Sequence, residues 1–139
     1  MPNWKKIKKL RDILVAHRDT PSRKFDMASY IRIISGKRNT RTVTVKELRD
    51  NGSACGSAAC IAGIAFINFE APNKRVRLVY GTCFTIAASV RRLLELSQEE
   101  ADWMFLGSWS GIPDIWPTRR MAVRYLNKCI KEKDVMVRL

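Results

Sequence analysis

The residues of this chain that could do chemistry are four cysteines and one histidine. Cys55 and Cys60 lie close together in the sequence, whereas Cys83 and Cys129 are distant from them and from each other. Zinc sites usually contain two cysteines separated by two residues, and a separation of five places the side chains about 140° apart around a helix. We therefore expect thiols, with no metal and no cofactor. The sequence leaves open whether all four cysteines converge in space.

Cys55 is the thiol with the strongest claim to reactivity. We predict that it lies at the start of a helix, where the helix dipole lowers a thiol pKa. A cysteine nucleophile also needs a base and a group that orients the base. The single histidine, His17, falls on the apolar side of another predicted helix. Because no complete catalytic constellation is present, we predict a protein that is not an enzyme, with no catalytic residues.

Charge is the strongest signal in the sequence. Of 139 residues, 26 are Lys or Arg and 13 are Asp or Glu, which gives a formal net charge of +13. This excess predicts an anionic partner such as nucleic acid, a phospholipid surface or an acidic protein. No apolar run approaches the ~20 residues of a membrane span, and the first residues lack the features of a signal peptide. We therefore expect a cytoplasmic protein with no membrane partner.

Apolar periodicity predicts a mainly α-helical fold. Residues 52–69 contain no charged residue, and residues 58–67 are apolar on every side, so we predict a buried central helix over residues 55–68. Further helices are expected over residues 3–17, 85–94 and 117–132 from apolar spacing of three and four. The capping-box pattern of Ser97 and Glu100 predicts a helix over residues 97–105, and Thr44 is expected to cap a helical turn through Leu48. The prediction is a single compact domain, residues 1–139, with about five helices around the central one.

Residues 31–54 form a predicted basic insert or, alternatively, a β-hairpin. Two β-branched runs, residues 30–34 and 41–45, flank a basic tip at residues 35–40. We also expect a helical turn over residues 25–30, a short strand over residues 74–80 and a frayed tail over residues 134–139.

These elements define a predicted binding surface for nucleic acid or another partner. The first helix, the 37–41 tip and the last helix supply its cations: Lys5, Lys8, Lys9, Lys37, Arg38, Arg41, Arg120, Arg124, Lys128 and Lys131. Trp109, in a Gly-Ser loop, is the aromatic candidate for this surface, where it could stack on a base or anchor a partner if it is exposed; the alternative is that it packs in the core. Because the sequence contains no helix-turn-helix, zinc-finger or RNA-recognition-motif signature, sequence-specific reading is not implied.

Residues 25–30, 55–63 and 94–105 resemble a small uncharacterised family of bacteriophage and bacterial proteins. Its members carry F-x-M-x-x-W/Y, C-G-T/S-x-x-C-I/L-A-G and L-G-L-x-x-x-E-A-x-x-L-F elements. This chain differs from the family at Ile64, where Trp or His is frequent, and at Glu95, where Gly is frequent. The resemblance implies a compact helical fold and a phage or mobile-element setting, and it assigns no functional residue.

Charge and resemblance together predict a non-enzymatic accessory protein of phage type, acting in the host cytoplasm. It is expected to bind nucleic acid or a nucleoprotein through its basic surfaces. Two alternatives remain open: an anti-defence, anti-CRISPR-like inhibitor that docks on a host protein complex, and a sponge for a small anionic nucleotide signal.

Overall fold

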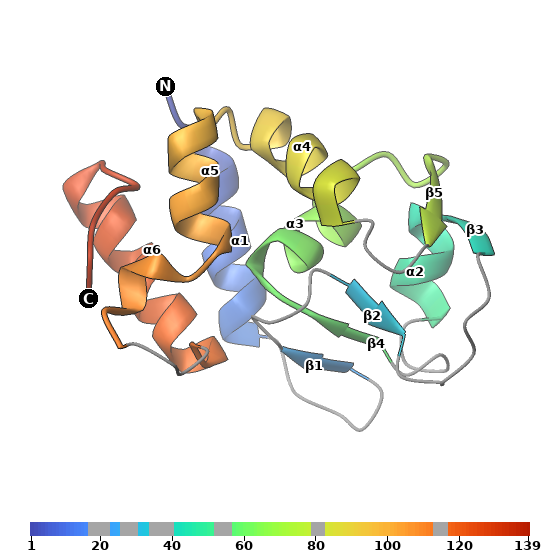
Figure 1. Cartoon of the computed structure of the whole chain (residues 1–139), viewed down its shortest axis with the longest axis horizontal. Helices are drawn as coiled ribbons and strands as arrows, with labels where there is room; N and C mark the ends of the chain where they lie inside the picture. Colours follow the sequence, from blue (N-terminus) through green and yellow to red (C-terminus); the bar gives the residue numbers. More distant parts are fainter. Residues whose placement is uncertain (17–22, 26–30, 34–40, 52–56, 79–82, 113–116) are drawn as a thin grey trace.

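The computed structural model describes residues 1–16, 23–25, 31–33, 41–51, 57–78, 83–112 and 117–139 (Figure 1). These residues form a mainly helical protein, which confirms the predicted fold class. The helices are α1 Trp4–Ala16, α2 Val45–Asn51, α3 Ile61–Phe69, α4 Cys83–Leu93, α5 Gln98–Phe105, α6 Arg119–Glu132 and the short 3-10 turn Ser108–Ser110. The strands are β1 Arg23–Phe25, β2 Ile31–Ile33, β3 Arg41–Thr44, β4 Ser57–Ala59 and β5 Arg75–Leu78.

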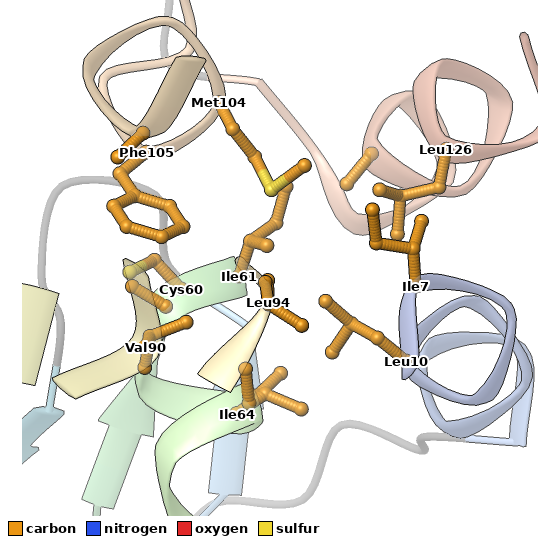
Figure 2. Close-up of a cluster of buried hydrophobic side chains, with 14 of the residues drawn as sticks. Ile7, Leu10, Cys60, Ile61, Ile64, Val90, Leu94, Met104, Phe105 and Leu126 are labelled. Atoms are coloured by element: carbon orange, nitrogen blue, oxygen red, sulfur yellow. The ribbon is translucent and has the colours of Figure 1, made fainter. Parts of the chain in front are cut away.

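Helix α3 lies at the centre of the core. Its residues 61–66 are all buried, as an all-apolar helix requires. Figure 2 shows Ile61 and Ile64 of α3 among side chains from other helices, including Leu10 of α1, Val90 of α4 and Leu126 of α6. The predicted central helix is therefore confirmed for its second half.

The first half of that prediction is wrong, because α3 begins only at Ile61. Residues 57–59 form strand β4, and Cys60 is the N-cap residue. Strand β4 pairs in parallel with β1 and antiparallel with β2, so its backbone hydrogen bonds go to a sheet rather than to a helical turn. Since the helix starts at Ile61, the argument that its dipole activates Cys55 also fails. Cys55 itself lies outside the described residues.

The predicted hairpin is also wrong. Its first arm, β2, pairs with β4, whereas its second arm, β3, pairs antiparallel with β5 in a separate sheet. In that second sheet Val43 lies opposite the buried Val76, so the two β-branched residues share one cross-strand position. The predicted helical turn fails at its first residue, because Phe25 ends strand β1, and residues 26–30 lie outside the described part. The strand expected over residues 74–80 is found as β5.

Helix boundaries agree with the capping signals of the sequence. At α5, the Ser97 hydroxyl accepts a hydrogen bond from the Glu100 N–H (3.1 Å), and the Ser97 N–H donates to the Glu100 carboxylate (2.9 Å). Thr44 caps α2 by accepting from the Glu47 N–H at 3.1 Å, and Thr118 caps α6 by accepting from the Met121 N–H at 3.3 Å.

The prediction that the tail, residues 134–139, is frayed is wrong, because the tail packs against the rest of the protein. Val135 is fully buried and Val137 is 7% exposed. The carbonyl of Val135 accepts from the Tyr125 hydroxyl (2.7 Å), and that of Val137 accepts from the Trp103 indole N–H (3.0 Å). Lys133, in the left-handed conformation (φ 55°), ends α6 and turns the chain back along it (Figure 1). The alternating valines of this segment were a burial signal that the prediction missed.

Glu95, just beyond the end of helix α4, has a left-handed backbone conformation that is unfavourable for a residue with a side chain. Glu95 has φ 54°, the N–H of Leu96 donates to the Arg91 carbonyl (2.9 Å), and the N–H of Glu95 donates to the Arg92 carbonyl (3.2 Å). This is the Schellman arrangement, whose left-handed residue is usually glycine.

We expect Glu95→Gly to raise the free energy of unfolding by about 0.5–1 kcal/mol, because it relieves the left-handed strain. The gain is reduced by loss of the hydrogen bond from the Asn3 side-chain amide to the Glu95 carboxylate (2.7 Å). Urea unfolding of both proteins measures the difference. Glu95→Ala, which loses the same hydrogen bond without gaining backbone freedom, is the matched control and should be less stable than wild type.

Candidate nucleic-acid interface

The structure places two of the predicted basic segments side by side. Helices α1 and α6 pack against each other, and the Arg11 guanidinium donates to the Asn127 side-chain oxygen at 2.7 Å, across 116 residues of sequence. The Arg119 guanidinium donates to the Leu14 carbonyl at 2.8 Å, and the Lys133 ammonium lies 5.2 Å from the centre of the Trp4 ring. The order of these contacts shows that the two helices are antiparallel (Figure 1).

Each helix buries an apolar stripe and turns cations outward. The buried residues of α1 are Ile7, Leu10 and Leu14, and those of α6 are Ala122, Tyr125, Leu126 and Cys129. The exposed cations form what we call the α1–α6 basic face: Lys5, Lys8, Lys9, Arg120, Arg124 and Lys131. Six of the ten predicted cationic site residues therefore lie on adjacent helices.

This face is strongly and locally charged. Each of the two helices carries five Lys or Arg residues and one acidic residue, so each has a net charge of +4. Together they account for more than half of the chain's net charge of +13. Two ion pairs join described side chains, Arg11–Asp12 at 2.7 Å and Lys74–Glu70 at 3.1 Å, and neither involves a residue of the basic face. Since Asp12 is engaged by Arg11, the face has little internal neutralisation.

Of the other four predicted cations, the two that the structure describes, Lys128 and Arg41, do not extend this face. The Lys128 ammonium donates to the Arg138 carbonyl at 2.5 Å, so this side chain is used to hold the tail. Arg41 begins strand β3, opposite Leu78 of β5, at the end of the molecule away from α6 (Figure 1). Lys37 and Arg38 lie outside the described residues.

The structure places Trp109 in the core, which was the alternative to a place on the binding surface. Its side chain is fully buried, stacks on Tyr125 with ring centres 4.5 Å apart, and donates from the indole N–H to the Met104 carbonyl at 3.0 Å. Gly107 (φ 73°) and Gly111 (φ 69°) flank its 3-10 turn and allow the loop to fold back onto the core. Trp109 is therefore a core residue and belongs to no binding surface.

Cys60 and Cys129, the two cysteines whose side chains the structure describes, are buried thiols. Burial raises the pKa of the Cys129 thiol to about 12, even though its hydrogen bond with Tyr125 lowers it. Burial likewise raises the pKa of the Tyr125 hydroxyl. Among the described residues no group of three or more His, Cys, Asp or Glu side chains gathers as a metal site would require. At neutral pH, Cys129 is thus a protonated packing residue.

Within the described ranges, no helix has the length and apolar content needed to cross a bilayer. Comparison of the chain with protein-family models, with curated proteins and with solved structures gives no match. The phage-type family resemblance consequently stays a prediction, and the case for a function rests on the α1–α6 basic face.

Proposed function

We propose that this protein binds nucleic acid, alone or within a nucleoprotein, through the α1–α6 basic face and without catalysis. The observation that carries the proposal is the packing of two helices, each with a net charge of +4, with their cations facing outward together. Placing ten cations on two adjacent helices destabilises the folded protein through charge repulsion, unless counterions or an anionic ligand screen the charges. A polyanion on the face removes this repulsion and gains free energy by releasing its counterions.

The length of the face favours a polymer over a small anion. Arg120 and Lys131 are eleven residues apart on one helix, and both are exposed. At 1.5 Å per residue they are separated by about 16 Å along the axis. An extended chain of phosphates can contact both ends of this row at once, whereas a single nucleotide cannot. The sponge alternative is therefore less well supported than nucleic-acid binding.

The residue types suit phosphate groups. Arginine presents a planar fork of donors that matches two phosphate oxygens, and lysine acts as a mobile point charge. Both types are present on the face, with two arginines on α6 and three lysines on α1. The proposed setting is the cytoplasm of a host cell, with the protein acting as a phage-type accessory factor.

The first test measures binding of the wild-type protein to labelled 20-mer nucleic acid by fluorescence anisotropy between 50 and 200 mM salt. If all six cations of the face contact phosphates, the slope of log K against log salt should be about −5, and affinity should fall roughly 10³-fold over this range. An absence of binding at 50 mM salt contradicts the proposal.

The inhibitor alternative predicts a different result in a pull-down from host lysate. A nucleic-acid binder recovers proteins that disappear after nuclease treatment, because the nucleic acid is the bridge. An inhibitor that docks on a protein surface retains one complex whether or not nuclease is added. Retention of one stoichiometric complex after nuclease treatment argues against our proposal.

A further inference from the structure

We infer that the ligand of the α1–α6 basic face is the phosphate backbone of a double-stranded nucleic acid, bound without reading its bases. This inference rests on the proposed function and narrows it to one structural class of ligand. Three features of the described residues support it: the positions of the tryptophans, the two rows of cations, and the hydrogen bonds between those rows.

The first feature argues against a single strand. Proteins that hold single strands stack the unpaired bases on accessible aromatic rings. In the described part of the chain, the exposed large hydrophobic residues are Met1, Val15, Leu106, Ile112 and Met136, none of which is aromatic. Trp109 is buried. The half-buried Trp4 and Trp103 each have a cation over the ring, Lys133 at 5.2 Å and Arg138 at 5.4 Å.

The second feature fits a duplex. The cations lie in two rows, one on each of two antiparallel helices that pack directly together, and axes of such helices are typically 8–10 Å apart. A duplex carries about one charge per 1.7 Å of its axis, so the ~16 Å row of α6 lies against roughly ten phosphate charges over about five base pairs. Two backbones that flank a groove can meet both rows, whereas a single strand must bend to reach both.

The third feature argues against base reading. Reading a base edge requires long polar side chains that project freely into a groove. Between the two rows lie Arg11, Asn127 and Arg119, and these are bonded within the protein. Arg11 donates to Asn127 at 2.7 Å, and Arg119 donates to the Leu14 carbonyl at 2.8 Å. The side chains between the rows are therefore held by the protein, and we expect the outward cations on either side of them to contact phosphates.

The test uses the whole chain with 20-base-pair DNA and RNA duplexes of two unrelated sequences and with each strand alone, all at 100 mM salt. We expect duplexes of unrelated sequence to bind within about three-fold of each other and at least ten-fold more tightly than either strand. The DNA and RNA arms identify which duplex is preferred. Equal or tighter binding of a single strand, or a ten-fold sequence preference, overturns the inference.

A preference for duplex could also come from its higher charge density alone, with single strands still stacking on a tryptophan. A variant without Trp4 tests for such stacking. We expect Trp4→Leu, with its fold checked by circular dichroism, to bind duplex and single strand within two-fold of the wild-type protein. Loss of a stacked base would weaken single-strand binding about five-fold or more and would overturn the inference. If no polyanion binds at all, the proposed function itself fails, which is a distinct result from a preference for single strands.

Discussion

Changing Lys5 and Arg120 to Glu together should lower the affinity for nucleic acid about 100-fold or more at 0.1 M salt. Both side chains are exposed members of the α1–α6 basic face. Each phosphate contact contributes roughly one order of magnitude in affinity at this salt concentration, and each introduced carboxylate adds repulsion. Fluorescence anisotropy with a labelled duplex measures the change, and a loss of less than five-fold contradicts the assignment of the face.

The same double variant should fold at least as well as the wild-type protein. Lys5 is the second residue of α1, and Arg120 is the second residue of α6. A carboxylate in the first turn of a helix interacts favourably with the helix dipole, by about 0.3–1 kcal/mol each. The melting temperature followed by circular dichroism should therefore be unchanged or higher, so that lost binding is not a consequence of unfolding.

The matched control is Lys46→Glu with Arg75→Glu, which makes the same change in net charge at the other end of the molecule. Both residues are exposed, Lys46 is the second residue of α2, and Arg75 begins β5 (Figure 1). We expect this control to reduce affinity only about three-fold, through the weaker overall field. Equal losses in the two double variants would mean that net charge, rather than the α1–α6 basic face, determines binding.

Deleting residues 134–139 should destabilise the protein by about 3–5 kcal/mol. The deletion exposes the surface that Val135 and Val137 cover, and burying one such side chain contributes about 1.5–3 kcal/mol. It also removes the carbonyl acceptors of the Tyr125 hydroxyl and the Trp103 indole N–H. The expected decrease in melting temperature is roughly 10–20 °C, measured by calorimetry.

Two point variants locate this effect within the tail. Val135→Ala, at a fully buried side chain, should cost about 1–2 kcal/mol. Met136→Ala, at the neighbouring 36%-exposed side chain, should change stability by less than about 0.5 kcal/mol. If the deletion lowers the melting temperature by less than 3 °C, the tail does not pack as the structure describes.

Local patterns in the sequence were sufficient to place α1, α4, α5 and α6 and the second half of the predicted central helix. The apolar spacing of Ile7, Leu10 and Leu14 predicted α1, and the charge-free segment predicted that α3 is buried. The Ser97 and Glu100 pair predicted the start of α5. These signals work because side chains three or four residues apart share a helix face, and because caps act within one turn. The total charge, and with it the expectation of an anionic partner, also comes from composition alone.

Contacts between distant segments decided the rest. Strand β2 pairs with β4 and not with its neighbour β3, because pairing depends on which edge is available and not on proximity in sequence. Trp109 is buried because the fold brings Tyr125 beneath its loop. The α1–α6 basic face exists because an apolar core holds the two ends of the chain together, across 116 residues at Arg11 and Asn127. Sequence periodicity shows which side of each helix is polar, but only packing shows which polar sides become neighbours.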